Sequence, residues 1–179
     1  MIYITYYASP IGKLVLACKE GVLIGLWMEG QKYFMSNFVD EIEENDNVEP
    51  FTKVKEWLER YFNNERPSVK ELPLSPQGSE FRKDVWDILC TIPYGETCTY
   101  KDIANLIAKR RGVDRMSAQA IGGAVGHNPI SIIIPCHRVV GTNGSLTGYA
   151  GGIDKKVFLL KHEGVSMKTL YTPQGNDLI

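Results

Sequence analysis

The sequence predicts an α+β protein in which a small N-terminal antiparallel sheet with helices is followed by a mostly helical C-terminal domain. Three observations predict this class. Apolar and polar residues alternate through 1–28, apolar residues recur at helical spacing through much of the rest, and a stretch over 64–78 holds three prolines with little periodicity. We expect that stretch to be a linker, with one domain over 1–78 and another over 79–179.

Three strands and two helices are expected in the first domain. Turn residues at Pro10, Gly12 and Gly21 divide the alternating stretch into short strands. Beyond them, apolar side chains such as Phe51 and Trp57 have the spacing of one helix face. The expected strands are 2–8, 13–19 and 22–28, and the expected helices are 31–44 and 50–63.

Two neighbouring helices in the second domain predict a helix-turn-helix. Thr99 and Asp102 form a capping pair at the start of the first helix, and Asp114 is placed to cap the second. A short basic turn joins the two helices. The expected helices are 100–109 and 114–126, so the motif covers about 100–126.

Two further helices flank this motif. Ser79 is placed to cap a helix that ends before Pro93, and an amphipathic helix over 154–162 ends before Gly164. Between them, an apolar run leads directly to Pro135.

The cysteines of the chain are expected to be free thiols. Cys18, Cys90, Cys98 and Cys136 form no closely spaced pair and have no histidine at ligand spacing, so we expect neither a metal site nor a disulfide framework. The chain has no apolar run of about 18 residues, and its first residues are predicted to be a strand rather than a signal peptide. We therefore expect an intracellular, cytoplasmic protein without a membrane partner.

Charge is divided unevenly along the chain. Residues 1–79 hold 8 Lys+Arg and 12 Asp+Glu, a net of −4, whereas residues 80–179 hold 12 and 9, a net of +3. A basic half beside an acidic half is compatible with a polyanionic partner, but an ordinary scatter of surface charge explains it equally well.

Glycines inside the expected helix 114–126 need an explanation. Gly122 and Gly123 each cost about 1 kcal/mol relative to alanine inside a helix. The face away from the core, which includes Arg115 and Gln119, is almost free of bulky side chains. Two interpretations remain open: the backbone of DNA approaches this face, or the small residues pack tightly against another helix. A DNA-binding helix with so few long polar side chains would have little sequence preference.

The sequence Pro135-Cys136-His137 is a candidate nucleophilic site. Pro135 interrupts regular pairing at the end of the apolar run, and His137 is a candidate to generate the Cys136 thiolate, which is the reactive form. Glu163, just beyond the last helix, is a candidate carboxylate for orienting the imidazole. The residues alone leave open the alternative that Cys136 is an inert buried cysteine.

The stretch Gly123–Gly164 resembles the O6-alkylguanine-DNA alkyltransferases, also called methylated-DNA–protein-cysteine methyltransferases. The hallmark of the family is the tetrapeptide Pro135-Cys136-His137-Arg138. Other matching residues are Asn128-Pro129, Gly148-Tyr149, Gly151-Gly152, Leu159-Leu160 and Glu163-Gly164, with Ile92 to Gly95 and Thr99-Tyr100 upstream. The N-terminal half is similar to the family in layout only, a ribonuclease-H-like arrangement of a small sheet and helices.

The resemblance implies a DNA-repair reaction that each molecule performs once. Cys136 would accept a methyl or other alkyl group from O6 of guanine, or from O4 of thymine, after the damaged base flips out through the minor groove of double-stranded DNA. His137 would take the thiol proton through a water molecule, Glu163 would orient His137, and Asn128 would brace the turn. Tyr100 would hydrogen-bond the flipped base or its phosphate. No cofactor is implied, and a monomer is expected.

The resemblance also implies a set of residues that contact DNA or the flipped base. They are Arg115, Gln119, Ala120, Gly122, Gly123, Val125, Arg138, Val139, Tyr149 and Ala150. The chain departs from the family at Gln119, where many members carry an arginine that fills the gap left by the flipped base. We expect Gln119, or Arg115 one turn earlier, to take that role. The turn between the two helices is also longer than in other members.

Three other functions compete with alkyl transfer. A subgroup of the family binds alkylated DNA without repairing it, but it lacks the cysteine that this chain has at position 136. A Cys–His–Glu hydrolase would need an oxyanion hole and would turn over repeatedly. A transcription regulator built on the helix-turn-helix would bind a specific DNA sequence without forming a covalent product.

Overall fold

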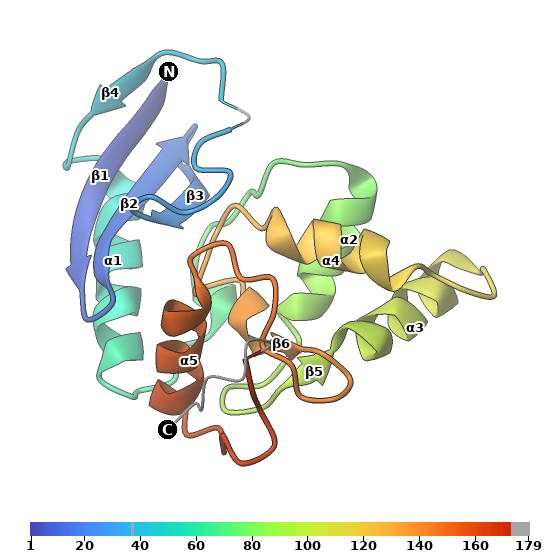
Figure 1. The fold of residues 1–179 in the computed structure, drawn as a ribbon. Coiled ribbons are helices and arrows are strands. Elements are labelled where there is room, and N and C mark those ends of the chain that lie inside the picture. The colour runs from blue at the N-terminus through green and yellow to red at the C-terminus, as the bar shows by residue number, and fades with distance from the viewer. Residues whose placement is uncertain (37, 173–179) are drawn as a thin grey trace. The chain divides into compact units, whose positions relative to one another are not determined.

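The computed structural model describes residues 1–36 and 38–172, and the chain divides into two compact units (Figure 1). Unit 1 contains Met1–Gln77 together with Pro129–Ile133, and unit 2 contains Gly78–Asn128 together with the chain from Ile134 onward. The expected domain boundary after residue 78 lies one residue from the change between the units. It does not account for residues 129–133, which belong to unit 1. Asn37, within the expected helix 31–44, and residues 173–179 lie outside the described residues.

Unit 1 is built on a four-stranded sheet with the order β3-β2-β1-β4. The first three strands are antiparallel and match the expected strands to within one residue, whereas β4 pairs parallel with β1. Gly12 and Gly21, at the two tight turns, have φ angles of +105° and +80°, which glycine adopts readily. The strands are β1 (Ile2–Ser9), β2 (Gly12–Lys19), β3 (Val22–Met28) and β4 (Ile42–Glu44).

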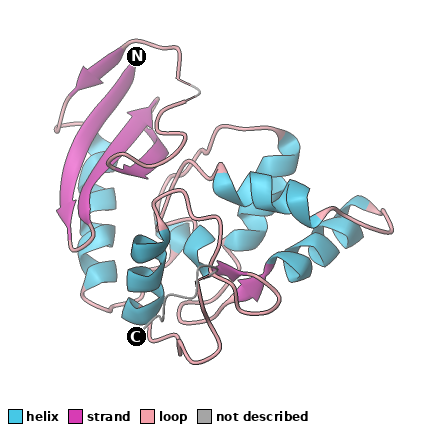
Figure 2. Ribbon diagram, viewed as in Figure 1, coloured by secondary structure: helices cyan, strands magenta, loops and turns pink. Residues whose placement is uncertain are grey.

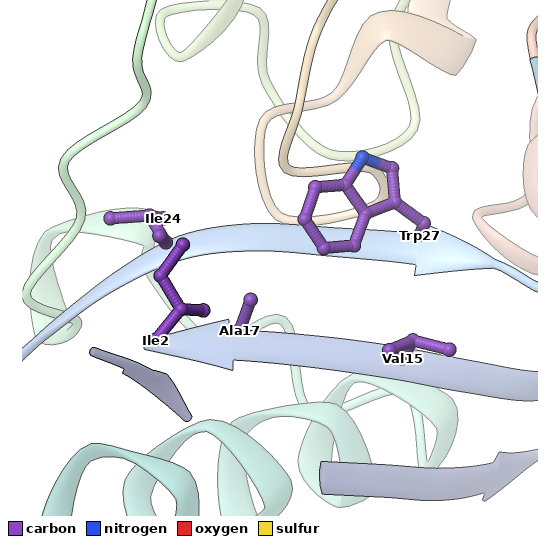
Figure 3. Packing of buried hydrophobic residues seen from close by; sticks show 5 residues of the cluster. All are labelled: Ile2, Val15, Ala17, Ile24 and Trp27. Atoms are coloured by element: carbon purple, nitrogen blue, oxygen red, sulfur yellow. The ribbon is translucent and has the colours of Figure 1, made fainter. Parts of the chain in front are cut away.

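The sheet buries apolar side chains on both of its faces. Helix α1 (Glu49–Phe62) contacts β1, β2 and β3 and confirms the expected helix 50–63. Its buried residues are Pro50, Phe51, Val54, Trp57, Leu58 and Tyr61. The opposite face holds the five residues labelled in Figure 3, which point away from α1: Ile2, Val15, Ala17, Ile24 and Trp27.

The expected helix over 31–44 is wrong. The described part of this segment forms turns followed by β4, and Tyr33 has a φ angle of +60°, which an α-helix excludes. The rings of Phe34 and Phe38 meet the ring of Trp27 edge-on, with centroids 5.5 and 5.3 Å apart. The apolar side chains of the segment therefore cover the sheet around Trp27 and do not form one face of a helix.

Residues 64–78 are attached to the sheet rather than free. They contain the 3-10 turn η1 (Val69–Glu71), and the chain then runs beside β3. The Leu23 amide donates to the Pro73 carbonyl, and the Ser75 amide donates to the Leu23 carbonyl, each at 2.8 Å. The segment does connect α1 to the next helix, as expected of a linker. It is not a free linker, however, because its backbone is hydrogen-bonded to β3.

The segment 129–133 pairs with the same strand further along. The Leu26 amide donates to the Pro129 carbonyl, and the Ser131 amide donates to the Leu26 carbonyl, both at 2.9 Å. The Ile133 amide then donates to the Ser131 carbonyl at 2.8 Å across Ile132, whose φ angle is +70°. This is the geometry of a γ-turn with a left-handed central residue, which is strained for a β-branched side chain.

The described part of unit 2 is mostly helical, and Figure 2 draws a short two-stranded sheet in magenta beside its cyan helices. That sheet pairs β5 and β6 in parallel. The indole Nε1 of buried Trp86 on α2 donates to the Ala124 carbonyl on α4 at 2.8 Å, which ties these two helices together. The elements are α2 (Glu80–Leu89), β5 (Cys98–Thr99), α3 (Tyr100–Arg111), α4 (Ala118–Gly126), the 3-10 turn η2 (Cys136–Arg138), β6 (Val139–Val140) and α5 (Ile153–His162).

Most of the expected caps are present in unit 2. The Ser79 hydroxyl accepts a hydrogen bond at the start of α2, and Thr99 and Asp102 form a reciprocal capping box at α3. The exception is the start of α4, where Ser117 is the cap instead of Asp114. Helix α4 therefore begins four residues later than expected. None of the described helices is both long enough and apolar enough to cross a membrane.

Candidate active site

A tight turn delivers Cys136 to the interior of unit 2. The Cys136 amide donates to the Ile134 carbonyl at 2.8 Å across Pro135, whose φ and ψ angles of −82° and 63° form an inverse γ-turn. The same carbonyl accepts a hydrogen bond from Asn128 Nδ2 at 2.8 Å. Asn128 is itself buried two residues after the end of α4, so it connects the end of that helix to the turn before the cysteine.

The Cys136 side chain is almost wholly buried, with 6% of its surface exposed. Burial raises the pKa of the thiol, and a hydrogen bond from Asn128 and the charge of Lys156 oppose that rise only in part. The side chain is therefore a thiol at neutral pH. A base must take its proton before it can act as a nucleophile.

His137 is the imidazole next to this thiol, and its two nitrogens have different surroundings. Nε2 lies 2.6 Å from Oε2 of Glu163, and both side chains are fully buried. Nδ1 is buried and has no hydrogen-bond partner within residues 1–36 and 38–172. Burial lowers the pKa of His137, so the ring is neutral at neutral pH. A carboxylate at Nε2 holds the proton there, which leaves the lone pair on Nδ1.

Glu163 lies at the C-terminal end of α5 and accepts several hydrogen bonds besides that of His137. Nε and Nη2 of Arg138 donate to its two oxygens at 2.7 and 3.1 Å, and the Gly95 amide donates to Oε1 at 3.2 Å. Burial alone would raise the pKa of Glu163, but the hydrogen bonds from His137 and Arg138 and the charge of Arg138 hold it well below its usual range.

A buried lysine, which sequence reasoning missed, lies in the same region. Lys156 on α5 is 1% exposed, and its Nζ donates to the carbonyls of Val139 at 2.6 Å and Thr147 at 3.4 Å. Burial lowers its pKa to about 8, and the nearby Cys136 opposes that change. Helical lysines usually face solvent, so the sequence contains no signal for this position.

Two tyrosines complete the surroundings of the cysteine. The Tyr100 hydroxyl donates to the Thr147 carbonyl at 3.1 Å, and burial and the neighbouring Cys136 raise its pKa to about 12. The Tyr149 hydroxyl is buried and has no hydrogen-bond partner among the described residues. Burial, then the charges of Cys136 and Glu163, raise the pKa of Tyr149 well above 10. Both phenols are therefore protonated at neutral pH.

An open groove of about 560 Å³ borders this site on the side of the helix-turn-helix. It brings together Tyr100 from α3, Gln119 and Gly122 from α4, and the loop that follows β6. The other lining residues are Lys101, Ala118, Gly141, Thr142, Thr147 and Gly148. Of the expected DNA-contacting residues, only Gln119 and Gly122 line this groove. Ala120 and Gly123 are exposed on α4, Ala150 is half-buried, and Val125, Val139 and Tyr149 are buried.

Arg115 is not placed as the sequence suggests. Because α4 begins at Ala118, Arg115 lies in the preceding turn and is exposed there. Its expected position one helical turn before Gln119 on the same face is therefore wrong.

The glycines of α4 face open space. A Cβ atom built on Gly122 or Gly123 would meet no described atom within 4 Å, apart from the backbone of the helix itself and the neighbouring residues. Tight packing of a neighbouring helix therefore does not explain these glycines.

Comparison with known proteins identifies the family. Residues 2–76 match the 6-O-methylguanine DNA methyltransferase, ribonuclease-like domain, and residues 80–165 match the 6-O-methylguanine DNA methyltransferase, DNA binding domain. The chain belongs to the 6-O-methylguanine DNA methyltransferase family. The resemblance found in the sequence is thus confirmed, as is the α+β fold class with a ribonuclease-like first domain.

Relatives of this family member span nearly its whole length. The methylated-DNA–protein-cysteine methyltransferase of Methanosarcina mazei is 47% identical over 163 residues, which cover 89% of this chain and 96% of the relative. That of Haemophilus influenzae is 39% identical over 164 residues, which cover 92% and 87%. The crystal structure of Mycobacterium tuberculosis OGT in complex with DNA aligns with a TM-score of 0.77 at 39% identity and covers 90% of this chain and 92% of that one.

Proposed function

We propose that this chain repairs DNA by transferring a methyl or other alkyl group from O6 of guanine to Cys136, once per molecule. The observation that carries the proposal is the buried Cys136 thiol beside a neutral His137 whose Nε2 is held by Glu163 at 2.6 Å. Relatives named methylated-DNA–protein-cysteine methyltransferases support the choice of DNA as alkyl donor and cysteine as acceptor.

The proposed chemistry is a displacement at the alkyl carbon. His137 Nδ1 takes the thiol proton, directly or through a water molecule, and Sγ of Cys136 attacks the alkyl carbon. The S–C bond forms as the C–O6 bond breaks, and the electron pair passes to the guanine. Tyr100 is protonated and borders the groove, so its hydroxyl can donate to the departing base if it first leaves the Thr147 carbonyl. A thioether carbon is a poor electrophile, which makes the product permanent.

The groove beside α4 is the proposed DNA interface. Its small residues allow a sugar-phosphate backbone to approach closely, and we propose that the damaged base flips out of the minor groove toward Cys136. Gln119, which lines the groove, is the proposed residue that fills the gap in the duplex. Gln119→Ala should slow repair of duplex DNA while Arg115→Ala leaves the rate unchanged; the reverse order would contradict this assignment.

Two narrower proposals concern substrate range and assembly. O4-alkylthymine presents the same kind of alkyl–oxygen bond on a ring carbon, so it is the proposed second substrate. One chain is proposed to suffice, because every catalytic residue named above belongs to unit 2. Duplex DNA is the proposed partner.

Mass measurement tests the reaction. After incubation with a duplex that contains O6-methylguanine, the protein should gain the mass of one methylene on the Cys136 peptide and stop at one equivalent. Cys136→Ser should gain nothing, whereas Cys18→Ser, a matched change at a buried cysteine in unit 1, should react normally. Repeated turnover would favour a hydrolase. Binding without a mass gain would favour a DNA-binding regulator.

A further inference from the structure

The Arg138 side chain points into unit 2, although the family resemblance implies a contact with DNA. Only 11% of the side chain is exposed. Nε donates to Oε1 of Glu163 at 2.7 Å, Nη2 donates to Oε2 at 3.1 Å, and Nη1 donates to the Ile92 carbonyl at 2.7 Å. The guanidinium also lies over the ring of Tyr94, 5.7 Å from its centroid. All three nitrogens are therefore engaged inside the protein.

We propose that Arg138 is a positioning residue for the reaction proposed above, which holds and neutralises Glu163 so that His137 remains an uncharged base, and that it does not contact DNA. The inference rests on the proposed function of Cys136 and His137. A phosphate contact would require the guanidinium to leave a buried carboxylate, and uncovering a buried charge is costly.

The first part of this role is orientation. An arginine fork that donates to both oxygens fixes the plane of a carboxylate, which a single contact does not. The Gly95 amide adds a third donor at 3.2 Å. Glu163 Oε2 is then held where it lies 2.6 Å from Nε2 of His137, so the ring itself has a fixed orientation.

The second part of the role is charge balance. An unopposed carboxylate beside His137 would favour the imidazolium, which has no lone pair for the thiol proton. The positive charge of Arg138 acts against Glu163 and lowers the pKa of His137, as does the charge of Lys156, while burial has the largest lowering effect. The other titratable groups of the site are Cys136 on η2, Tyr100 on α3, and Tyr149 in the loop before α5.

Titration of His137 by NMR tests the proposal without alkyl transfer. In Arg138→Gln, the His137 ring should become protonated at a pH higher by at least about one unit, because the carboxylate loses its counter-charge. Arg138→Lys keeps a charge near Glu163 and should restore most of the wild-type titration. Arg60→Gln removes an exposed ion pair with Glu71 in unit 1 and should change nothing. An unmoved His137 titration in Arg138→Gln would overturn the proposal.

Two further measurements separate positioning from DNA contact. The single-turnover rate of Arg138→Gln should fall most at low pH, about tenfold for each pH unit by which the His137 titration moves. Its DNA affinity should keep the wild-type salt dependence. A salt slope reduced by about 0.9, the value expected for one lost phosphate contact, would show that Arg138 binds DNA instead. If wild type forms no S-alkylcysteine, the proposed function fails. The His137 titration and the salt dependence of DNA binding still test the role of Arg138 independently.

Discussion

At the scale of single residues, the reactivity of Cys136 must come from its neighbours. Only 6% of the surface of Cys136 is exposed, so water does little to stabilise a thiolate, and burial raises the pKa of the thiol. His137 is also uncharged at neutral pH, because burial lowers its pKa. Both partners therefore rest in their neutral forms, and in the proposed reaction the thiol proton passes to His137 as Sγ of Cys136 attacks. This arrangement protects the thiol from oxidation, which requires the thiolate.

Replacement of His137 tests this proton transfer. His137→Gln should lower the single-turnover rate at neutral pH by about 10²–10⁴-fold, the usual contribution of a general base. The deficit should shrink as pH rises, because the thiolate fraction of Cys136 then grows without help until pH passes the raised pKa of the thiol. His162→Gln, at the end of the same helix as Glu163, is the matched control. A deficit of equal size at every pH would exclude a role as base.

The sequence predicted the residues of this site better than their contacts. Pro135, Cys136 and His137 were visible as a motif, and the structure brings His137 and Glu163 together as expected. The inward direction of Arg138 and the burial of Lys156 were not predictable. Long charged side chains usually face solvent, so the sequence alone does not show which of them are buried. Only the packed fold determines which ones lie beside an opposite charge in the interior.

At the scale of elements, α4 combines poor helix formers with an open surface. Gly122 and Gly123 lower helix propensity, yet no described side chain occupies the space beside them. A partner that needs this space would explain why the helix keeps glycines despite their cost in helix stability. The proposed partner is DNA, in the groove that Gly122 lines.

Alanine substitutions on α4 should therefore affect stability and binding in opposite directions. Gly122→Ala should raise the free energy of unfolding by up to about 1 kcal/mol, since the Cβ meets open space and the unfolded chain loses entropy. The same methyl group should weaken affinity for duplex DNA, because it stands in the groove. Gly126→Ala, on α4 but outside the groove lining, should stabilise without weakening binding. Urea unfolding and a DNA-binding titration measure the two effects. Unchanged affinity in Gly122→Ala would contradict the proposed interface.

Errors in the predicted elements have identifiable causes. The segment 31–44 has apolar residues at helical spacing because Phe34 and Phe38 cover the sheet around Trp27, which is a tertiary requirement. The start of α4 was misplaced because Asp114 and Ser117 are both suitable caps, and propensity alone does not choose between them. At Thr99 the capping residues and the helical spacing of the apolar residues indicate the same starting point, and the start of α3 was predicted correctly.

At the scale of the whole molecule, the chain order does not follow the compact units. Residues 129–133 leave unit 2, pair with Leu26 of β3 in unit 1, and return to unit 2 just before Cys136. No local pattern predicts this, because the bonds join positions about a hundred residues apart, and the apolar run 130–134 suits any buried strand. A sequence divided at residue 78 thus assigns a segment of the first unit, residues 129–133, to the second domain.

This connectivity predicts that residues 1–77 are an incomplete folding unit. Ile130 is fully buried and Ile132 is 1% exposed, and burial of each such side chain contributes about 1.5–3 kcal/mol. A fragment of residues 1–77 should therefore unfold at a lower urea concentration than the same fragment with 129–133 attached through a glycine-rich linker. A linked segment with the same residues in scrambled order is the control, because it keeps composition but loses the pairing with Leu26. Equal midpoints for all three fragments would show that the sheet is complete without the segment. A gain confined to the native order would mean that the pairing of residues 129–133 with Leu26 stabilises unit 1, so that a cut at residue 78 removes part of this unit.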